Sequence, residues 1–125
     1  MGIYKHTEFF VWQRSNDVRR LIRGLTRRPG FREHQWLRSQ LRRAANTACN
    51  SFTEGFEKFY PREFARYVEI TKGSLGEIVD HLEDVVGLEL GSPEEATQIR
   101  RLATAEPEPP GTHRNYLEPL GTPTR

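Results

Sequence analysis

The sequence predicts an all-α protein, an antiparallel up-down four-helix bundle with a short fourth helix and a Pro-rich C-terminal tail. Apolar residues recur at steps of three, four and seven in four segments, the spacing that places them on one face of a helix. Helix-ending or helix-starting signals separate these segments, at Pro29-Gly30, Pro61 and Ser92-Pro93. The chain has 125 residues, 35% hydrophobic and 29% charged, which suits one domain of helices with solvated outer faces.

The first helix is expected from about residue 9 to residue 27. Thr7 precedes the apolar pattern as a candidate N-cap. The inward face consists of Val11, Val18, Leu21, Ile22 and Leu25. Off this face, Arg20, Arg23 and Arg27 form a row of their own, because residues three and four apart are neighbours on a helix.

A connector over residues 31–36, anchored by Trp36, leads to a second helix that ends at about residue 58. Its inward face consists of Leu37, Leu41, Ala44, Ala45, Ala48, Phe52 and Phe56. The three alanines are small enough to let another helix approach closely. Cys49 is interpreted as a small buried side chain rather than a reactive thiol.

The third helix is expected to begin at Pro61 and to end near residue 90. Its inward face consists of Phe64, Val68, Thr71, Leu75, Ile78, Leu82, Val85 and Val86. Gly73 and Gly76 lie within this helix, where each glycine costs about 1 kcal/mol relative to alanine. We therefore expect both glycines to pack closely against the alanines of the second helix.

The start of the fourth helix is marked by Ser92 as N-cap, Pro93 at the first position and Glu95 three residues after the cap. Its apolar positions are Ala96, Ile99, Leu102 and Ala103. The helical pattern then stops. We expect a four-helix bundle over residues 1–106, and a Pro-rich extended or disordered tail over 107–125, which holds five of the eight prolines.

The bulk composition narrows the location and the class of partner. No apolar run approaches the ~18 residues of a membrane-spanning helix, and no apolar leader segment is visible at the N-terminus. A single cysteine excludes an intrachain disulfide. These features predict a cytoplasmic protein without a membrane partner. Residues 1–60 hold twelve Lys and Arg and five Asp and Glu, whereas residues 61–106 hold five and ten. Such asymmetry indicates either a nucleic-acid surface or an attraction between the two halves, within or between subunits.

No convincing catalytic or metal site is found. A di-iron site in a helical bundle needs Glu-x-x-His pairs, but Glu77 precedes His81 by four residues and no second pair occurs. His81 is interpreted instead as a polar residue at a helix–helix boundary. Glu54 is a remote candidate for a catalytic acid, and more often such a residue accepts hydrogen bonds from a neighbouring helix. There is no phosphate-binding loop or dinucleotide fingerprint. We expect no enzyme activity, no cofactor and no small-molecule substrate.

Arginines carry the strongest functional signal, because the guanidinium group suits bidentate contacts with phosphate. The candidate nucleic-acid-binding residues are Arg19, Arg20, Arg23, Arg27, Arg38, Arg42 and Arg43. If the first two helices are adjacent, these side chains form one basic surface with Lys58 at its edge. The alternative is a solvated face whose arginines pair with the acidic third helix, in the same chain or in a neighbouring subunit.

Several short motifs occur in a fixed order between about residues 9 and 90. They are Val11-Trp12-Gln13, Leu25-Thr26 with Pro29, Ser39-Gln40-Leu41-Arg42-Arg43-Ala44-Ala45, Glu54-Gly55-Phe56, Glu63-Phe64 with Arg66-Tyr67, and Gly73-Ser74-Leu75 with Glu77. In this order and spacing the chain resembles the small four-helix bundle proteins named for open reading frames within intervening sequences of bacterial 23S rRNA genes. Where that family usually reads N-I-A-E-G, this chain has Thr53-Glu54-Gly55 preceded by Ser51-Phe52.

The resemblance implies an up-down bundle that assembles into a homo-oligomer, with a pentamer as the first expectation, and it does not imply an enzyme. The fold is also similar to that of the accessory variability protein of diversity-generating retroelements, a basic barrel that partners a reverse transcriptase and its template RNA. We therefore expect a protein that binds structured RNA, or an RNA–enzyme complex, through its arginines. A protein–protein scaffold without nucleic acid is the alternative.

Overall fold

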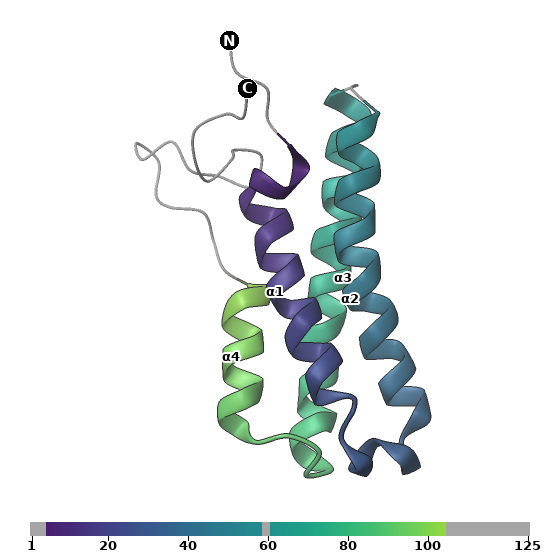
Figure 1. Ribbon diagram of the computed structural model, residues 1–125, viewed down its shortest axis with the longest axis vertical. Helices are drawn as coiled ribbons and strands as arrows, with labels where there is room; N and C mark the ends of the chain where they lie inside the picture. Colours follow the sequence, from purple (N-terminus) through teal and green to yellow (C-terminus); the bar gives the residue numbers. More distant parts are fainter. Residues whose placement is uncertain (1–4, 59–60, 105–125) are drawn as a thin grey trace.

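The computed structural model describes residues 5–58 and 61–104, and these residues fold into a helical bundle. The four α-helices are α1 (Phe10–Leu25), α2 (Gln35–Glu57), α3 (Pro61–Gly87) and α4 (Pro93–Ala103), and two short 3-10 helices are η1 (His6–Glu8) and η2 (Pro29–Glu33). Successive helices run in alternating directions, as expected for an up-down bundle, and α4 returns to lie beside α1 (Figure 1). The predicted all-α fold is confirmed. The expected tail over residues 107–125 lies outside the described residues.

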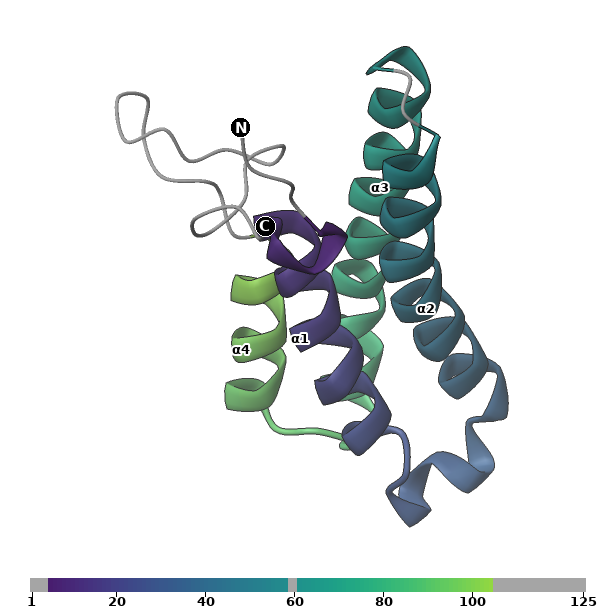
Figure 2. The same cartoon turned by 45° about the horizontal axis from the view of Figure 1, so that its top comes forward.

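The helices differ in length, and this difference gives the bundle two unequal ends. The long pair, α2 and α3, has 23 and 27 residues, whereas α1 has 16 and α4 has 11. One end of the α2–α3 pair therefore extends past the ends of α1 and α4 (Figure 2). None of the helices within the described ranges combines the length and the apolar character that a bilayer crossing requires.

The core consists of two apolar clusters that follow the predicted inward faces. The larger cluster includes Val18, Ile22, Leu41, Ile78 and Leu82, each fully buried, and takes residues from all four helices. The smaller cluster lies where η1 and the start of α1 meet the far ends of α2 and α3. It is aromatic, and its buried members are Phe9, Phe10, Val11, Phe52 and Val68. Burial on these faces is the main source of stability, because helix propensity alone does not hold short helices in water.

The start of α1 differs from the prediction. Residues 6–8 form the separate helix η1, so Thr7 lies inside a 3-10 turn and does not cap α1. Phe9 occupies the N-cap position in an extended conformation, without a side-chain hydrogen bond to the helix. Thr7 instead contributes its carbonyl oxygen, which accepts a hydrogen bond of 3.0 Å from Nε2 of Gln13. A side chain in the first turn of α1 thus holds the preceding 3-10 helix η1 in place.

The connector between α1 and α2 is anchored by Phe31 and not, as predicted, by Trp36. Phe31 lies in η2 and has 1% of its surface exposed, whereas Trp36 is 66% exposed at the start of α2. Pro29 and Gly30 begin the 3-10 turn that rotates Phe31 into the core. Trp36 makes an edge-to-face contact with His81, with ring centroids 5.6 Å apart. His81 is half-buried at the α2–α3 boundary, as the sequence predicted.

A glycine that lets α2 and α3 approach closely is Gly55, and not the predicted Gly73 and Gly76. A Cβ atom at Gly55 would lie 2.5 Å from Cβ of Tyr67, so a side chain has no room there. Nearby, the buried Thr71 hydroxyl donates a 2.9 Å hydrogen bond to the carbonyl of Ala48 across the same interface. Gly73 and Gly76 are exposed, and nothing lies within 4 Å of a Cβ atom at either position. The expectation that they pack against the alanines was wrong, because both lie on the outer face of α3.

The start of α4 is the predicted capping box. The Ser92 hydroxyl accepts a hydrogen bond of 3.1 Å from the backbone N–H of Glu95, and the Glu95 carboxylate accepts one of 2.9 Å from the backbone N–H of Ser92. The same carboxylate binds the guanidinium of Arg28 through both oxygens, one contact being 2.9 Å. Arg28 follows α1, so this contact joins the end of α1 to the start of α4.

Candidate nucleic-acid interface

Four of the seven candidate arginines surround one hollow between α1 and α2. Arg19 and Arg23 lie one turn apart on α1, Arg27 lies in the turn that follows this helix, and Arg42 faces them from α2. Together with Ala45 and Asn46 they line a volume of about 230 Å³. We call this feature the arginine hollow.

Arg42 is held in the hollow by a buried hydroxyl. Thr26 is fully buried at the end of α1, where its Oγ1 donates a 2.6 Å hydrogen bond to the carbonyl of Ile22. The same oxygen accepts a 2.7 Å hydrogen bond from Nε of Arg42. A threonine that returns its hydroxyl to the preceding turn therefore orients an arginine of the neighbouring helix.

Two asparagines orient arginines on α1. The Asn16 side-chain oxygen accepts a hydrogen bond of 3.0 Å from Arg19, one turn later on the same helix. The Asn46 side-chain oxygen on α2 accepts one of 3.2 Å from Arg23 across the helix pair. These partners carry no charge, so they fix the position of the guanidinium groups without neutralising them.

The hollow concentrates positive charge in a partly desolvated place. The pKa of Arg42 is lowered by burial first, and then by the like charges of Arg38, Arg27 and Arg23. Arg38 lies one turn before Arg42 on α2, which places a fifth arginine at the edge of the cluster. After burial, repulsion between these cations contributes to the lowered pKa, and an anion in the hollow would relieve that repulsion.

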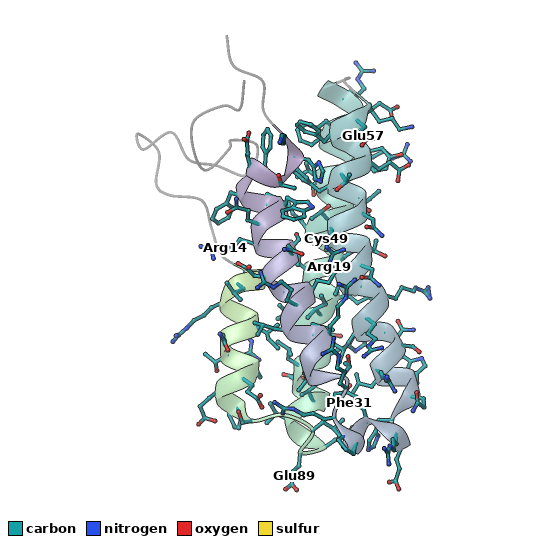
Figure 3. The ribbon with its side chains drawn as sticks, in the orientation of Figure 1. Arg14, Arg19, Phe31, Cys49, Glu57 and Glu89 are labelled. Atoms are coloured by element: carbon teal, nitrogen blue, oxygen red, sulfur yellow. The ribbon has the colours of Figure 1, made fainter. Side chains whose placement is uncertain are left out.

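Cys49 lies close to the same cluster, at the level of Arg19 in Figure 3. It is buried, with 1% of its surface exposed, as the sequence predicted. Burial raises the pKa of the Cys49 thiol, and the charges of Arg19 and Arg23 act in the opposite direction. A neutral, enclosed thiol of this kind is a packing residue and not a nucleophile.

Arg20 and Arg43 lie away from the hollow. Arg20 lines the surface between α1 and α4, where it lies near Leu21 and Gln98. The row that faces α2 is therefore Arg19, Arg23 and Arg27, in which Arg19 takes the place that the sequence analysis gave to Arg20. Arg43 is exposed and lies about 100° around α2 from Arg42. Lys58 lies about 24 Å further along α2, too far to form the edge of this surface.

The acidic third helix does not neutralise these arginines within the chain. The ion pairs among the described residues are Arg14–Asp17, Arg28–Glu95 and Lys72–Glu69. None of them includes one of the seven candidates. For the arginines of α1 the reason is the order of the helices around the bundle, in which α3 packs against α2 and α4 and lies diagonally opposite α1.

The candidate catalytic acid and the possible metal ligands are explained by contacts between helices or do not come together. The carboxylate of Glu54 accepts a hydrogen bond of 3.2 Å from the hydroxyl of Tyr67 on α3, which is the role expected of it at a helix boundary. Within residues 5–58 and 61–104, no three His, Cys, Asp or Glu side chains come together in a group that would hold a metal ion.

Sequence reasoning did not single out Thr26, Asn16 or Asn46 as parts of the site. The spacing of Asn16 and Arg19, three residues apart on one helix, was the available signal. The contacts of Thr26 with Arg42 and of Asn46 with Arg23 join different helices, so they depend on how α1 and α2 are rotated against each other.

Comparison with known proteins identifies a family for most of the chain. The family model described as "23S rRNA-intervening sequence protein" matches residues 7–105, which covers all four helices. Searches among curated proteins and among solved structures gave no significant match.

Proposed function

This chain belongs to the 23S rRNA-intervening sequence protein family, and on that premise we propose that it is a non-enzymatic protein that binds structured RNA through the arginine hollow and the arginines around it. The observation that carries the proposal is the convergence of four guanidinium groups between α1 and α2, three of which are held by neutral partners. The contacts are with phosphate groups, because the guanidinium group suits charge-assisted hydrogen bonds to phosphate oxygens, and such contacts position an RNA without reading its sequence.

The energetic reason is the release of counterions. A protein that neutralises several phosphates gains affinity with each one, and the gain falls as salt rises. Arginines already oriented by Asn16, Thr26 and Asn46 lose little further side-chain freedom on binding. This favours the hollow over the scattered exposed arginines elsewhere on the surface.

The proposal includes assembly into a homo-oligomer, with five copies as the first expectation, and a complex of RNA with an enzyme such as a reverse transcriptase as one target. Support comes from the family resemblance. Repetition of the arginine hollow around a ring would raise the affinity for one long RNA, because several sites would act on the same molecule.

The test is RNA binding as a function of salt. The probe is an RNA hairpin, measured by fluorescence anisotropy at several concentrations between about 50 and about 200 mM salt. Replacing both exposed arginines of the hollow, in the variant Arg23→Ala/Arg27→Ala, should weaken binding and reduce the slope of log K against log salt by about 2.

The matched control removes the same charge from helices that do not line the hollow. Arg62→Ala/Arg101→Ala should leave the salt slope close to that of the unmodified protein, because α3 and α4 take no part in the hollow. Absence of binding at the lower salt would overturn the proposal. If the Arg23/Arg27 variant instead dissociates to monomers in light scattering, the arginines join subunits and the scaffold function holds.

A further inference from the structure

We propose that the arginine hollow is a pocket for one compact phosphate group with more than one negative charge, a terminal phosphomonoester or a pyrophosphate, in preference to the singly charged diester of an RNA backbone. This inference rests on the proposed function, because it concerns the same arginines. It adds the chemical group that they bind, and the experiment below can fail without overturning RNA binding.

The first observation is convergence on one small volume. Contacts to a nucleic-acid backbone need cations spread along a surface, whereas Arg19, Arg23, Arg27 and Arg42 all border the same 230 Å³. Each guanidinium carries five N–H donors. A backbone diester offers one charge and two free oxygens, which is a poor match for this number of donors and charges.

The second observation is charge without compensation. Every oriented arginine of the hollow is held by an amide or a hydroxyl, namely Asn16, Asn46 or Thr26. None of the residues that line the hollow is acidic. A phosphomonoester carries about −1.5 to −2 charges and three terminal oxygens at neutral pH, so it neutralises more of the cluster than a diester does.

The third observation is an unpaired donor on Arg19, a residue that lines the hollow. Nε of Arg19 is buried and has no hydrogen-bond partner among the described residues, although the guanidinium tip of Arg19 binds Asn16. Buried donors are nearly always paired in folded proteins, so an unpaired one needs an explanation. This nitrogen is closed to solvent in the free protein, so an oxygen of a bound anion would supply the missing acceptor once the Arg19 side chain turns towards the hollow.

The experiment compares two ends of one RNA. A short single-stranded RNA is prepared with a 5′-phosphate and with a 5′-hydroxyl, and both affinities are measured at the same salt concentration by anisotropy of a 3′ label. We expect the phosphorylated RNA to bind about tenfold more tightly, the effect of one or two additional charge-assisted contacts. Inorganic pyrophosphate should displace the phosphorylated RNA from the protein. Displacement would show that the pocket takes the phosphate group as a free anion as well as at an RNA end.

Two variants with equal loss of charge locate the effect. Arg19→Gln/Arg27→Gln should abolish the preference for the phosphorylated end, since both side chains line the hollow. Arg20→Gln/Arg43→Gln should keep the ratio of the two affinities, whatever its overall affinity, because neither residue lines it. Thr26→Val, which removes the hydroxyl that holds Arg42, should reduce the ratio, and Thr26→Ser should restore it.

Equal affinities for the two RNA ends, with no displacement by pyrophosphate, would overturn the inference and leave salt-dependent RNA binding intact. The inference also fails if Arg20→Gln/Arg43→Gln loses the preference as fully as the variant of the hollow. Displacement by pyrophosphate in a protein that shows no affinity for an RNA hairpin would support the pocket and overturn the proposed function. The comparison of the two RNA ends needs only the unmodified protein, so a variant that fails to fold does not block the test.

Discussion

At the scale of single residues, Phe31 is the side chain that anchors the connection between α1 and α2 in the core. It is fully buried in η2, in contact with the main core, whereas Trp36 only five residues later is mostly exposed. Phe31→Ala should lower the free energy of unfolding by about 3–5 kcal/mol, because it leaves a cavity in addition to the lost burial. Trp36→Ala should lower it by less than about 1 kcal/mol.

Urea denaturation followed by circular dichroism measures both changes. A loss at Trp36 as large as that at Phe31 would show that the tryptophan is covered in solution, for example by another copy of the chain. The pair also illustrates a limit of sequence reading. Both residues are large and apolar in a short connector, and only the rotation of the 3-10 turn at Pro29 decides which of them points inward.

For the arginines, too, the rotation of an element decides which side chains come together. Their presence in the first two helical segments was predictable from composition and spacing, whereas the adjacency of the two helices entered the sequence analysis only as a condition. Which arginines share a face was not predictable, because Arg19 and Arg20 differ by one residue and the choice between them depends on the rotation of α1 against α2 and α4. The partners on the other helix, Thr26 with Arg42 and Arg23 with Asn46, are contacts that no local pattern encodes.

At the scale of the helices, three glycines differ in the space around them. Gly55 lies in the tightly packed interface of α2 and α3, whereas Gly73 and Gly76 lie on the exposed face of α3. Gly55→Ala should destabilise the protein by about 1–3 kcal/mol, since the new methyl group overlaps Tyr67. Gly73→Ala and Gly76→Ala should each stabilise it by up to about 1 kcal/mol, because alanine favours the helix and the space beside both positions is open.

Midpoints of urea unfolding for the three variants test these predicted changes in stability. Destabilisation by Gly73→Ala or Gly76→Ala, together with a change of mass in light scattering, would place these glycines in a contact between subunits. The inward faces of all four helices, the proline start of α3 and the capping box of α4 were correctly predicted, because each depends on residues close in sequence. The glycines were misassigned because their cost was attributed to packing, although both face outward.

At the scale of the whole molecule, the ion pair between Arg28 and Glu95 closes the bundle by joining the end of α1 to the start of α4. The hydrogen bonds from Arg28 and from the backbone of Ser92 lower the pKa of Glu95 from 4.5 to about 2. A carboxylate whose pKa is lower in the folded protein contributes stability above pH 4.5 and loses that contribution as the pH falls towards 2. The two side chains are 45% and 39% exposed, so screening limits the contribution to about 1 kcal/mol.

Glu95→Gln isolates this term, because the amide oxygen can still accept the hydrogen bond from Ser92 and preserve the capping box. Relative to the unmodified protein, the variant should be less stable at neutral pH, and the difference should vanish near pH 2. Glu94→Gln, which removes a charge from the same turn, should show a smaller difference at neutral pH. Thermal unfolding at a series of pH values provides the measurement, and a difference that does not depend on pH would contradict the prediction.

The neutral partners of the arginine hollow also bear on the speed of binding. Many basic sites in the free state are occupied by their own carboxylates, and an incoming anion must first displace them. Here Asn16, Thr26 and Asn46 can keep their hydrogen bonds while an anion arrives, so no internal ion pair has to open. Capture would then be limited by diffusion in the field of the four cations, with an association rate that falls steeply as the ionic strength increases.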